Sequence, residues 1–386
     1  MTKKAPEIRF KGFEDDWEQR KLNEFMDFSN GINAPKENYG KGTKMISVMD
    51  ILSADKMTYK NIRNSVSVSE VIESKNKVEI GDLVFVRSSE IVQEVGLSKA
   101  YTDNNYALYS GFSIRGKKKA EYNSLFMEIN LNNGNGRRQI ERKAGGSTRF
   151  NVSQEILNSI EVLLPTYEEQ NKIAGIFESL NYTIALHQRK SNQLELIKQA
   201  LLQKLFPKAG ETIPELRLRG FNEPLGQEKF EKVLKIHPFR QYLAESVENG
   251  RYEIVQQGDN PIIGYANGVP FQNFDGVTLF GDHTVSLYKP SKPFFIATDG
   301  VKILSGEDFN GKYLYTMLER FKPKSQGYKR HLSILKSEVI YYTKNSTEQV
   351  KIGELFSQFD RIITLNQNKI KNLTKIKNSL LQKMFI

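Results

Sequence analysis

The chain repeats itself, and this internal repeat constrains the architecture more strongly than any other feature of the sequence. The segment from Glu169 to Phe206 recurs as Glu348 to Phe385 at an unbroken offset of 179 residues (348 − 169). A shorter segment, Pro6 to Phe13, recurs as Pro214 to Phe221 at an offset of 208 residues (214 − 6). Each half of the chain therefore begins with the short repeat, which we name the opener, and ends with the long repeat.

The middles of the two halves share little sequence, and the second is shorter by about 29 residues (208 − 179). Both contain short β-type runs between clusters of Gly, Asn, Asp and Pro, for example Leu83–Val86, Phe294–Thr298 and Val339–Thr343. At ~150 residues per domain, a chain of 386 residues accommodates two such globules with separate cores. We therefore predict an α+β protein with a first globule and its opener at 1–166, a central long helix at 167–206, a linker at 207–213, a second globule and its opener at 214–346, and a C-terminal long helix at 347–386.

The long repeat is typical of a helix, because no Pro or Gly interrupts it after Gly175 in the first copy or Gly353 in the second. Its seam positions recur in alternating steps of four and three residues, which is the spacing of a coiled coil. We weigh two interpretations: each stripe packs on its own globule, or the two helices pair with each other. The second is favoured, because both copies keep the same stripe. The seam consists of Ile173, Phe177, Leu180, Ile184, His187, Ser191 and Leu194 in the first copy, and of Ile352, Phe356, Phe359, Ile363, Asn366, Ile370 and Leu373 in the second.

His187 and Asn366 are equivalent polar residues of this seam, and both lie at the middle of their repeats. An antiparallel pair of helices, related by a pseudo-twofold axis, would bring these two residues together. A buried polar pair of this kind fixes the register of the helices at some cost in stability. At ~1.5 Å per residue, the 38 residues of each repeat form a rod roughly 57 Å long. We therefore expect an antiparallel coiled coil that acts as a ruler between the two globules.

The composition excludes several classes of protein. Without any cysteine, the chain has no disulfide, thiolate zinc site, iron–sulfur cluster or cysteine nucleophile. No apolar run is long enough to span a membrane, and the first residues lack the apolar stretch of a secretory signal, so we expect a cytoplasmic location. The formal charge of +11, from 56 basic and 45 acidic residues, favours a polyanionic partner.

The sequence contains no recognisable catalytic motif. Two stretches that resemble a phosphate-binding loop, 111–117 and 306–312, continue with Lys118 and Tyr313 in place of the Ser or Thr that such a loop requires. The four histidines are far apart, so their spacing predicts no metal site. The chain has no Pro-Pro pair and so lacks the loop with which an amino-group DNA methyltransferase holds a flipped base. We therefore expect a non-catalytic chain without a metal or cofactor of its own.

Cations gather at corresponding places in the two halves, shortly before the last strand and the long repeat. They lie in the segments 115–119, 134–149 and 322–331, beside glycines that allow a backbone to approach phosphate closely. A solvated charged surface would look the same, but recurrence in both halves favours contact with DNA. The candidate DNA contacts are Arg115, Lys117, Lys118, Arg137, Arg138, Arg142, Lys143, Ser147, Thr148, Arg149, Lys322, Lys324, Tyr328, Lys329, Arg330 and His331.

The repeated order of opener, variable globule and long helix resembles the specificity subunit of type I restriction-modification systems over nearly the whole chain. In the first globule, Lys44–Ile51 and Gly81–Ser88 also resemble this family, and Arg87 and Ser88 join the candidate DNA contacts. In the second globule, Thr343-Lys344 replaces the exit residues Leu164-Pro165. The most specific segments are the opener Pro6–Trp17, the strand exit Leu163–Pro165 with Glu169-Gln170 after it, and the ending Leu201–Phe206, which recurs as Leu380–Phe385.

The resemblance implies two target-recognition domains, each of which reads one half of a split, asymmetric sequence in double-stranded DNA. It also implies that the helices dock two methyltransferase subunits and, through the complex, the restriction and translocase subunits. S-adenosylmethionine, ATP and Mg²⁺ would then bind to those partner subunits. The residues themselves leave two non-catalytic alternatives open: a stand-alone DNA-binding regulator, and a coiled-coil scaffold with a basic surface. The enzymatic alternative, a stand-alone nuclease or methyltransferase, is disfavoured because no catalytic motif is recognisable.

Overall fold

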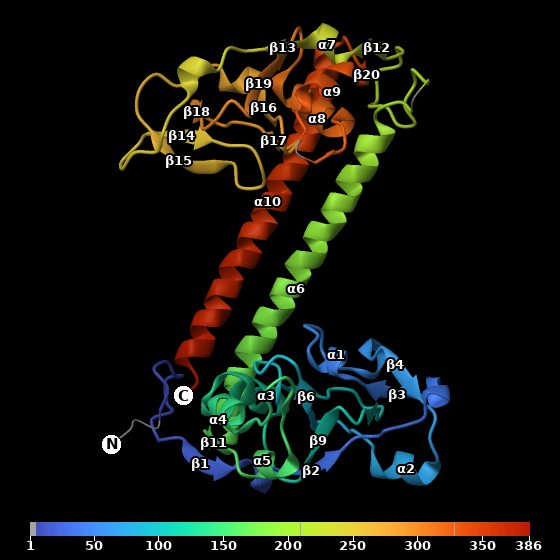
Figure 1. The fold of residues 1–386 in the computed structure, drawn as a ribbon, viewed down its shortest axis with the longest axis vertical. Coiled ribbons are helices and arrows are strands. Elements are labelled where there is room, and N and C mark those ends of the chain that lie inside the picture. The colour runs from blue at the N-terminus through green and yellow to red at the C-terminus, as the bar shows by residue number, and fades with distance from the viewer. Residues whose placement is uncertain (1–4, 209, 328) are drawn as a thin grey trace. The chain divides into compact units, whose positions relative to one another are not determined.

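The computed structural model describes residues 5–208, 210–327 and 329–386, which form two compact units (Figure 1). The first unit consists of the described part of residues 1–185 together with residues 371–386, and the second of the described part of residues 186–370. The division passes through both long helices, α6 (Tyr167–Lys204) and α10 (Ser346–Lys383). No helix in the described ranges is long and apolar enough to cross a membrane.

The first globule contains a four-stranded sheet and a three-stranded sheet. The four-stranded sheet has the order β2 (Met26–Asn30), β9 (Ser113–Lys118), β5 (Leu83–Val86), β7 (Ser98–Ala100), and the three-stranded sheet has the order β4 (Asn64–Val66), β3 (Tyr39–Ile46), β8 (Leu108–Tyr109). Two short pairs join β1 (Glu18–Lys21) to β11 (Glu161–Leu164), and β6 (Ser88–Ser89) to β10 (Phe150–Asn151). The helices are α1 (Val48–Ile51), α2 (Glu70–Lys75), α3 (Ser124–Asn133), α4 (Asn135–Lys143) and α5 (Gln154–Asn158).

The second globule repeats this topology. Its four-stranded sheet has the order β13 (Leu234–Ile236), β19 (Val301–Gly306), β16 (Val277–Gly281), β17 (Leu287–Tyr288), and its three-stranded sheet the order β15 (Ile262–Ala266), β14 (Tyr252–Val255), β18 (Phe294–Ile296). The strand β12 (Gly226–Lys229) pairs with β20 (Val339–Tyr342), as β1 pairs with β11. The helices are α7 (Phe230–Val233), α8 (Gly311–Phe321) and α9 (Leu332–Ser337). The prediction of two α+β globules is confirmed, and they share a fold that their sequences do not reveal.

The repeated ending of each long helix is explained by a core that it completes. In the first unit, Phe385 lies just beyond α10 and packs against Phe126 of α3, Phe177 of α6 and Trp17, with ring centroids 5.6, 5.8 and 6.3 Å away. In the second unit, Phe206 stacks on Tyr313 of α8 at 6.3 Å. Burial of such large aromatic rings is among the strongest contributions to core stability. The same Leu-Leu-Gln-Lys-x-Phe ending therefore closes both cores.

The repeated opener holds the base of each long helix through a buried ion pair. Arg9 donates to both carboxylate oxygens of Glu169 at 2.9 and 2.7 Å in the first unit. Arg217 donates to both oxygens of Glu348 at 2.6 and 2.8 Å in the second. Glu169 and Glu348 are buried, and the hydrogen bond to Glu348 raises the pKa of the Arg217 guanidinium. We call these two bidentate pairs the opener clamps.

The seam of the long helices serves both of the interpretations that the sequence left open. Ile173 and Phe177 are buried in the core of the first unit, and Ile352 and Phe356 in that of the second, so the base of each helix packs on its own globule. In the second unit, Nδ1 of His187 lies 2.8 Å from Oδ1 of Asn366, as predicted. Ile363 is buried, while Leu180, Ile184, Leu194, Phe359 and Leu373 are partly buried.

A lysine that was not among the predicted seam residues occupies the next position of this seam. Lys198 follows Leu194 by four residues, and its ammonium donates to Asp360 of α10 and to Glu319 of α8, both at 2.6 Å. Along α6 the contacts advance from His187 to Lys198 while along α10 they recede from Asn366 to Asp360. The two helices are therefore antiparallel, and the ion triad ties them to the second globule.

The His187–Asn366 pair is open to a double-mutant cycle. We expect His187→Leu alone to lower the free energy of unfolding by about 1–2 kcal/mol, because Asn366 loses its partner inside the seam. The double variant with Asn366→Leu should regain that loss or exceed the wild type, since two leucines fill the seam with apolar surface. Urea denaturation measures both. The register of the two helices is measured by crosslinking cysteines placed at Glu195 and Gln367, whose side chains lie 3.4 Å apart. Unchanged crosslinking in the double variant would contradict a role of the polar pair in fixing the register.

Candidate nucleic-acid interface

A tight turn between β8 and β9 presents an exposed aromatic ring in the first globule. The amide of Ser113 donates to the carbonyl of Ser110 at 2.9 Å and closes the turn, whose exposed residue is Phe112. The backbone at Gly31 packs closely against this turn. A Cβ atom at Gly31 would lie only 2.1 Å from the carbonyl oxygen of Ser110, so no larger residue fits there. The guanidinium of Arg149 lies over the Phe112 ring at 5.9 Å. The turn therefore holds a cation and an exposed ring together at the surface.

Several of the predicted DNA contacts meet at this turn. The amide of Arg87 donates to the carbonyl of Phe112 at 2.9 Å, and the Arg87 carbonyl accepts from the amide of Val152 at 3.0 Å. Pairing of β6 with β10 places Ser88 opposite Asn151, which follows the loop 144–149. Ser147, Thr148 and Arg149 are exposed on that loop. Arg87 and Ser88 are thus brought to one surface with Arg149, which lies about 60 positions further along the sequence.

The second globule has the same arrangement of backbone hydrogen bonds. Its turn between β18 and β19 is closed by the amide of Val301 and the carbonyl of Thr298 at 3.2 Å. The amide of Asp282 donates to Gly300 at 2.8 Å, and the Asp282 carbonyl accepts from the amide of His331 at 2.7 Å. Here Arg330 reaches the turn, with its Nη2 3.3 Å from Oδ2 of the exposed Asp299. Each globule therefore carries an arginine at the equivalent turn, but the side chain that it meets differs.

Two of the predicted DNA contacts in the first globule serve the fold. The guanidinium of Arg137 donates to the carbonyls of Val95 and Val92 at 2.7 and 3.0 Å and to Glu141 at 2.7 Å, so the side chain is buried and internally bonded. Arg115 is also buried and donates to the carbonyl of Lys77. Burial raises the pKa of the neighbouring Asp82 carboxyl, and the positive charge of Arg115 is among the contacts that oppose this shift. Both arginines donate hydrogen bonds to backbone carbonyl oxygens inside the globule.

The expected basic loop 134–149 is largely a helix. Residues 135–143 form α4, and only 144–149 is the exposed loop that reaches the turn. Arg138 and Arg142 are exposed on α4, and Lys143 donates to the hydroxyl of Ser159 at 2.8 Å. Lys117 and Lys118 lie on β9, where Lys118 donates to the carbonyl of Tyr122 at 2.8 Å. These residues are not brought to the turn.

The second basic segment also divides between surface and interior. Lys324, Lys329 and Arg330 are exposed, and Lys322 donates to the carbonyl of Val285 at 3.3 Å. His331 was expected to contact DNA but is buried. Its Nε2 accepts a hydrogen bond from the amide of Gln326 at 2.9 Å, so the ring fixes the backbone of this segment. Tyr328 lies outside the described residues. Phe112 and Asp299 were missed, although a residue beside Gly between two β-type runs was a signal for an exposed turn.

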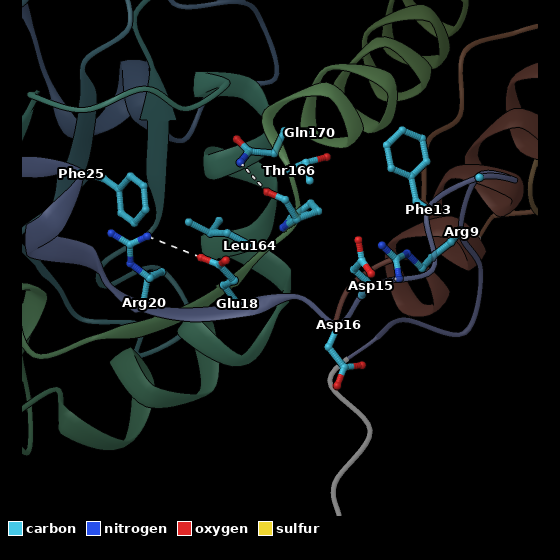
Figure 2. A pocket seen from close by; sticks show the side chains of 12 residues that line it. Arg9, Phe13, Asp15, Asp16, Glu18, Arg20, Phe25, Leu164, Thr166 and Gln170 are labelled. Carbon is cyan, nitrogen blue, oxygen red and sulfur yellow. Dashed lines mark hydrogen bonds and ion pairs between the residues drawn. The ribbon is translucent and has the colours of Figure 1, made fainter.

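A cavity of about 420 Å³ at the opener of the first unit has the wrong charge for DNA (Figure 2). Asp15, Asp16 and Glu18 line it, and the two arginines that also line it form ion pairs with other residues. Arg9 belongs to the opener clamp, and Arg20 pairs with Glu24 at 2.6 Å. The carboxylates would repel phosphate, so the turn surface, not this cavity, is the candidate interface.

Comparison with known proteins agrees with this geometry. Residues 14–196 match the family model described as the type I restriction modification DNA specificity domain. Over this stretch, the chain is similar to the type I restriction modification DNA specificity domain. The turn that carries Phe112 and the loop that carries Arg149 both lie inside the matched residues.

Solved structures extend the likeness of fold beyond the specificity domain. The S subunit of a type I restriction-modification system from M. genitalium matches with a TM-score of 0.69 and 15% identity, and the match covers 99% of each chain. A second structure, described as the structural basis underlying complex assembly and conformational transition of the type I R-M system, matches with a TM-score of 0.50 and 14% identity over 97% of this chain and 98% of that one. At these identities the matches establish the fold.

Proposed function

We propose that this chain is the DNA-specificity subunit of a type I restriction-modification complex, in which each globule reads one half of a bipartite, asymmetric target. The observation that carries the proposal is one topology used twice with different side chains at the equivalent turn: Phe112 beneath Arg149 in one copy, Asp299 beside Arg330 in the other. Two domains with the same fold but different exposed side chains can recognise two different DNA sequences. The net charge of +11 supports a polyanionic partner.

Catalysis and its cofactors belong, in this proposal, to other subunits. S-adenosylmethionine would bind to two methyltransferase subunits, and ATP and Mg²⁺ to restriction and translocase subunits that join the same complex. The test is co-expression of the chain with type I methyltransferase subunits, followed by sequencing of methylated DNA. A bipartite methylated sequence supports the proposal. Specific DNA binding without methyltransferase recruitment would instead identify a stand-alone regulator, and indifference to DNA would identify a scaffold.

A second row of apolar residues on the long helices supports the docking of partner subunits. Leu186 on α6 and Leu365 on α10 occupy equivalent repeat positions in the second unit, and both are more than half exposed. Ile197 follows Leu186 by 11 residues, about three helical turns, and is also exposed. These residues lie outside the seam that pairs the helices. Exposed apolar side chains at helical spacing are suited to packing against helices of another subunit.

We expect the double variant Leu186→Glu with Leu365→Glu to abolish co-purification with methyltransferase subunits, because two charges would be buried in the new interface. DNA binding by the variant chain should be unchanged. The matched control is Gln188→Glu with Gln367→Glu, which adds the same charge at exposed positions of the same helices. Equal loss of co-purification in both variants would show that charge alone, not the apolar row, governs assembly.

The salt dependence of binding tests the turn surface. Changing Arg149 to Ala should flatten the slope of the logarithm of affinity against the logarithm of salt concentration by about 0.9, the value for one lost phosphate contact. Arg219, an exposed arginine of the second opener, is the control, and its change to Ala should leave the slope unaltered. Fluorescence anisotropy at several salt concentrations measures both. If Arg149→Ala and Arg219→Ala give the same slope, the Arg149 loop does not contact phosphate.

A further inference from the structure

We propose that the exposed side chain of the equivalent turn reads a base in each half-site: Phe112 contacts a thymine methyl group, and Asp299 accepts a hydrogen bond from the amino group of a cytosine. This inference rests on the proposed function and deepens it, because it names the two residues that distinguish the globules and the base chemistry that each recognises. Neither residue was among the contacts expected from basic segments of the sequence.

The case for Phe112 begins with its position at the tip of a closed turn. Its side chain is 55% exposed, whereas Ser110, Gly111 and Ser113 around it are buried. The backbone of the turn is fixed by Arg87, whose amide donates to Phe112 O and whose Nη1 donates to Gly111 O at 3.2 Å. A ring held rigidly outward gains free energy only when another molecule covers it. The cations Arg149 and Arg87 beside it indicate that the covering molecule is anionic.

The chemistry of the ring decides what it recognises. Phenylalanine offers no hydrogen bond, so at a base edge in the major groove it is suited to the C5-methyl group of thymine. Arg149, whose guanidinium lies 5.9 Å from the ring centroid, is then placed to bind a phosphate or a guanine edge beside that base.

The case for Asp299 follows from the equivalence of the two turns. The amides of Arg87 and Asp282 make the same bond to their turns, at 2.9 Å to Phe112 and at 2.8 Å to Gly300. Gly300 is therefore the counterpart of Phe112, and Asp299, one position before it, supplies the exposed side chain of the second turn. Asp299 is exposed, and Nη2 of Arg330 lies 3.3 Å from its carboxylate. A carboxylate at this surface repels phosphate but accepts from the amino group of cytosine. Arg330 neutralises Asp299 and can donate its remaining N–H groups to the partner guanine or to phosphate.

The experiment selects binding sites from a pool of random-sequence DNA duplexes with the full chain, alone and assembled with methyltransferase subunits. The wild type is expected to select a bipartite sequence. Phe112→Ala should relax the thymine preference at one position of one half-site, and Asp299→Asn should shift one position of the other half-site from cytosine toward adenine, which an amide recognises. Replacing that thymine by uracil, which lacks the methyl group, should weaken wild-type binding about fourfold and leave Phe112→Ala unaffected.

The controls separate this inference from the function on which it rests. Val71→Ala removes another exposed apolar side chain of the first globule and should change no base preference. Failure of the wild type to select any sequence would overturn the proposed function and this inference together. A wild type that selects a bipartite sequence, with unchanged preferences in Phe112→Ala and Asp299→Asn, would overturn this inference alone. Because both residues are exposed, unaltered thermal unfolding of the variants should confirm that the fold is intact.

Discussion

Replacing Glu348 with Ala is expected to lower the free energy of unfolding by about 2–4 kcal/mol, one of the two largest effects that the structure predicts. Glu348 is buried and accepts both hydrogen bonds of the second opener clamp, so its loss leaves the Arg217 guanidinium largely buried without a counter-charge. Removing one partner of such a pair costs far more than removing both. The joint change of Arg217 to Met and Glu348 to Leu should therefore recover most of the loss.

The measurement has to distinguish the two units, because a chain of two cores need not unfold in one step. Hydrogen exchange followed by mass spectrometry reports each unit, and Glu348→Ala should lower protection in the second unit first. Glu169→Ala should do the same in the first unit, where Arg9 loses its partner. The control is Glu215→Ala, which breaks an exposed ion pair with Lys204 and should leave the stability almost unchanged, because solvent screens such pairs. Equal losses in Glu348→Ala and Glu215→Ala would contradict the clamp.

The repeats and the heptad spacing predicted the architecture because both report interactions that recur along the chain. The opener and the long repeat were recognisable in the sequence, and the clamps explain why they occur together. Arg9 binds Glu169 across 160 positions in the first copy, and Arg217 binds Glu348 across 131 positions in the second. The equivalent midpoints predicted the bond between His187 and Asn366. Because the opener clamp and the helix seam each occur twice in the structure, the residues that form them recur in the sequence and can be recognised there.

The individual contact residues could not be predicted in the same way, because burial depends on partners that are distant in sequence. Arg137 and Arg138 are adjacent, yet the partners of Arg137 are carbonyls 42 and 45 positions away, while Arg138 is exposed. Lys198 was missed because one of its two acceptors, Glu319, belongs to the globule and not to the repeat. Phe112 was missed because a search for cations passes over an aromatic residue. Local charge therefore predicted which segments carry cations, but not which of their side chains are exposed.

Under the proposed function, lengthening both long helices by one heptad is expected to produce a protein that recognises the same two half-sites at a longer spacing. Seven residues keep the seam in phase and add about 10 Å, which is close to three base pairs at ~3.4 Å each. The insertions belong near Ser191 in α6 and between Asp360 and Asn366 in α10, the stretch that faces it, because His187 contacts Asn366 and Lys198 contacts Asp360. The base preferences should be unchanged, since the turns that carry Phe112 and Asp299 are untouched.

Two further variants make the spacing result decisive. Insertion of five residues at the same places turns the seam by about 140° beyond a full turn, so the helices should no longer pair and specific methylation should be lost. Exchange of residues 231–346 for the corresponding segment of a type I specificity subunit should, under the proposed function, change one half-site and leave the spacing unaltered. Sequencing of methylated DNA measures the target of each protein: the heptad insertion, the five-residue insertion and the segment exchange. If the heptad insertion altered base preferences while the spacing stayed the same, the helices would be part of the readout surface, and their length would not set the distance between half-sites.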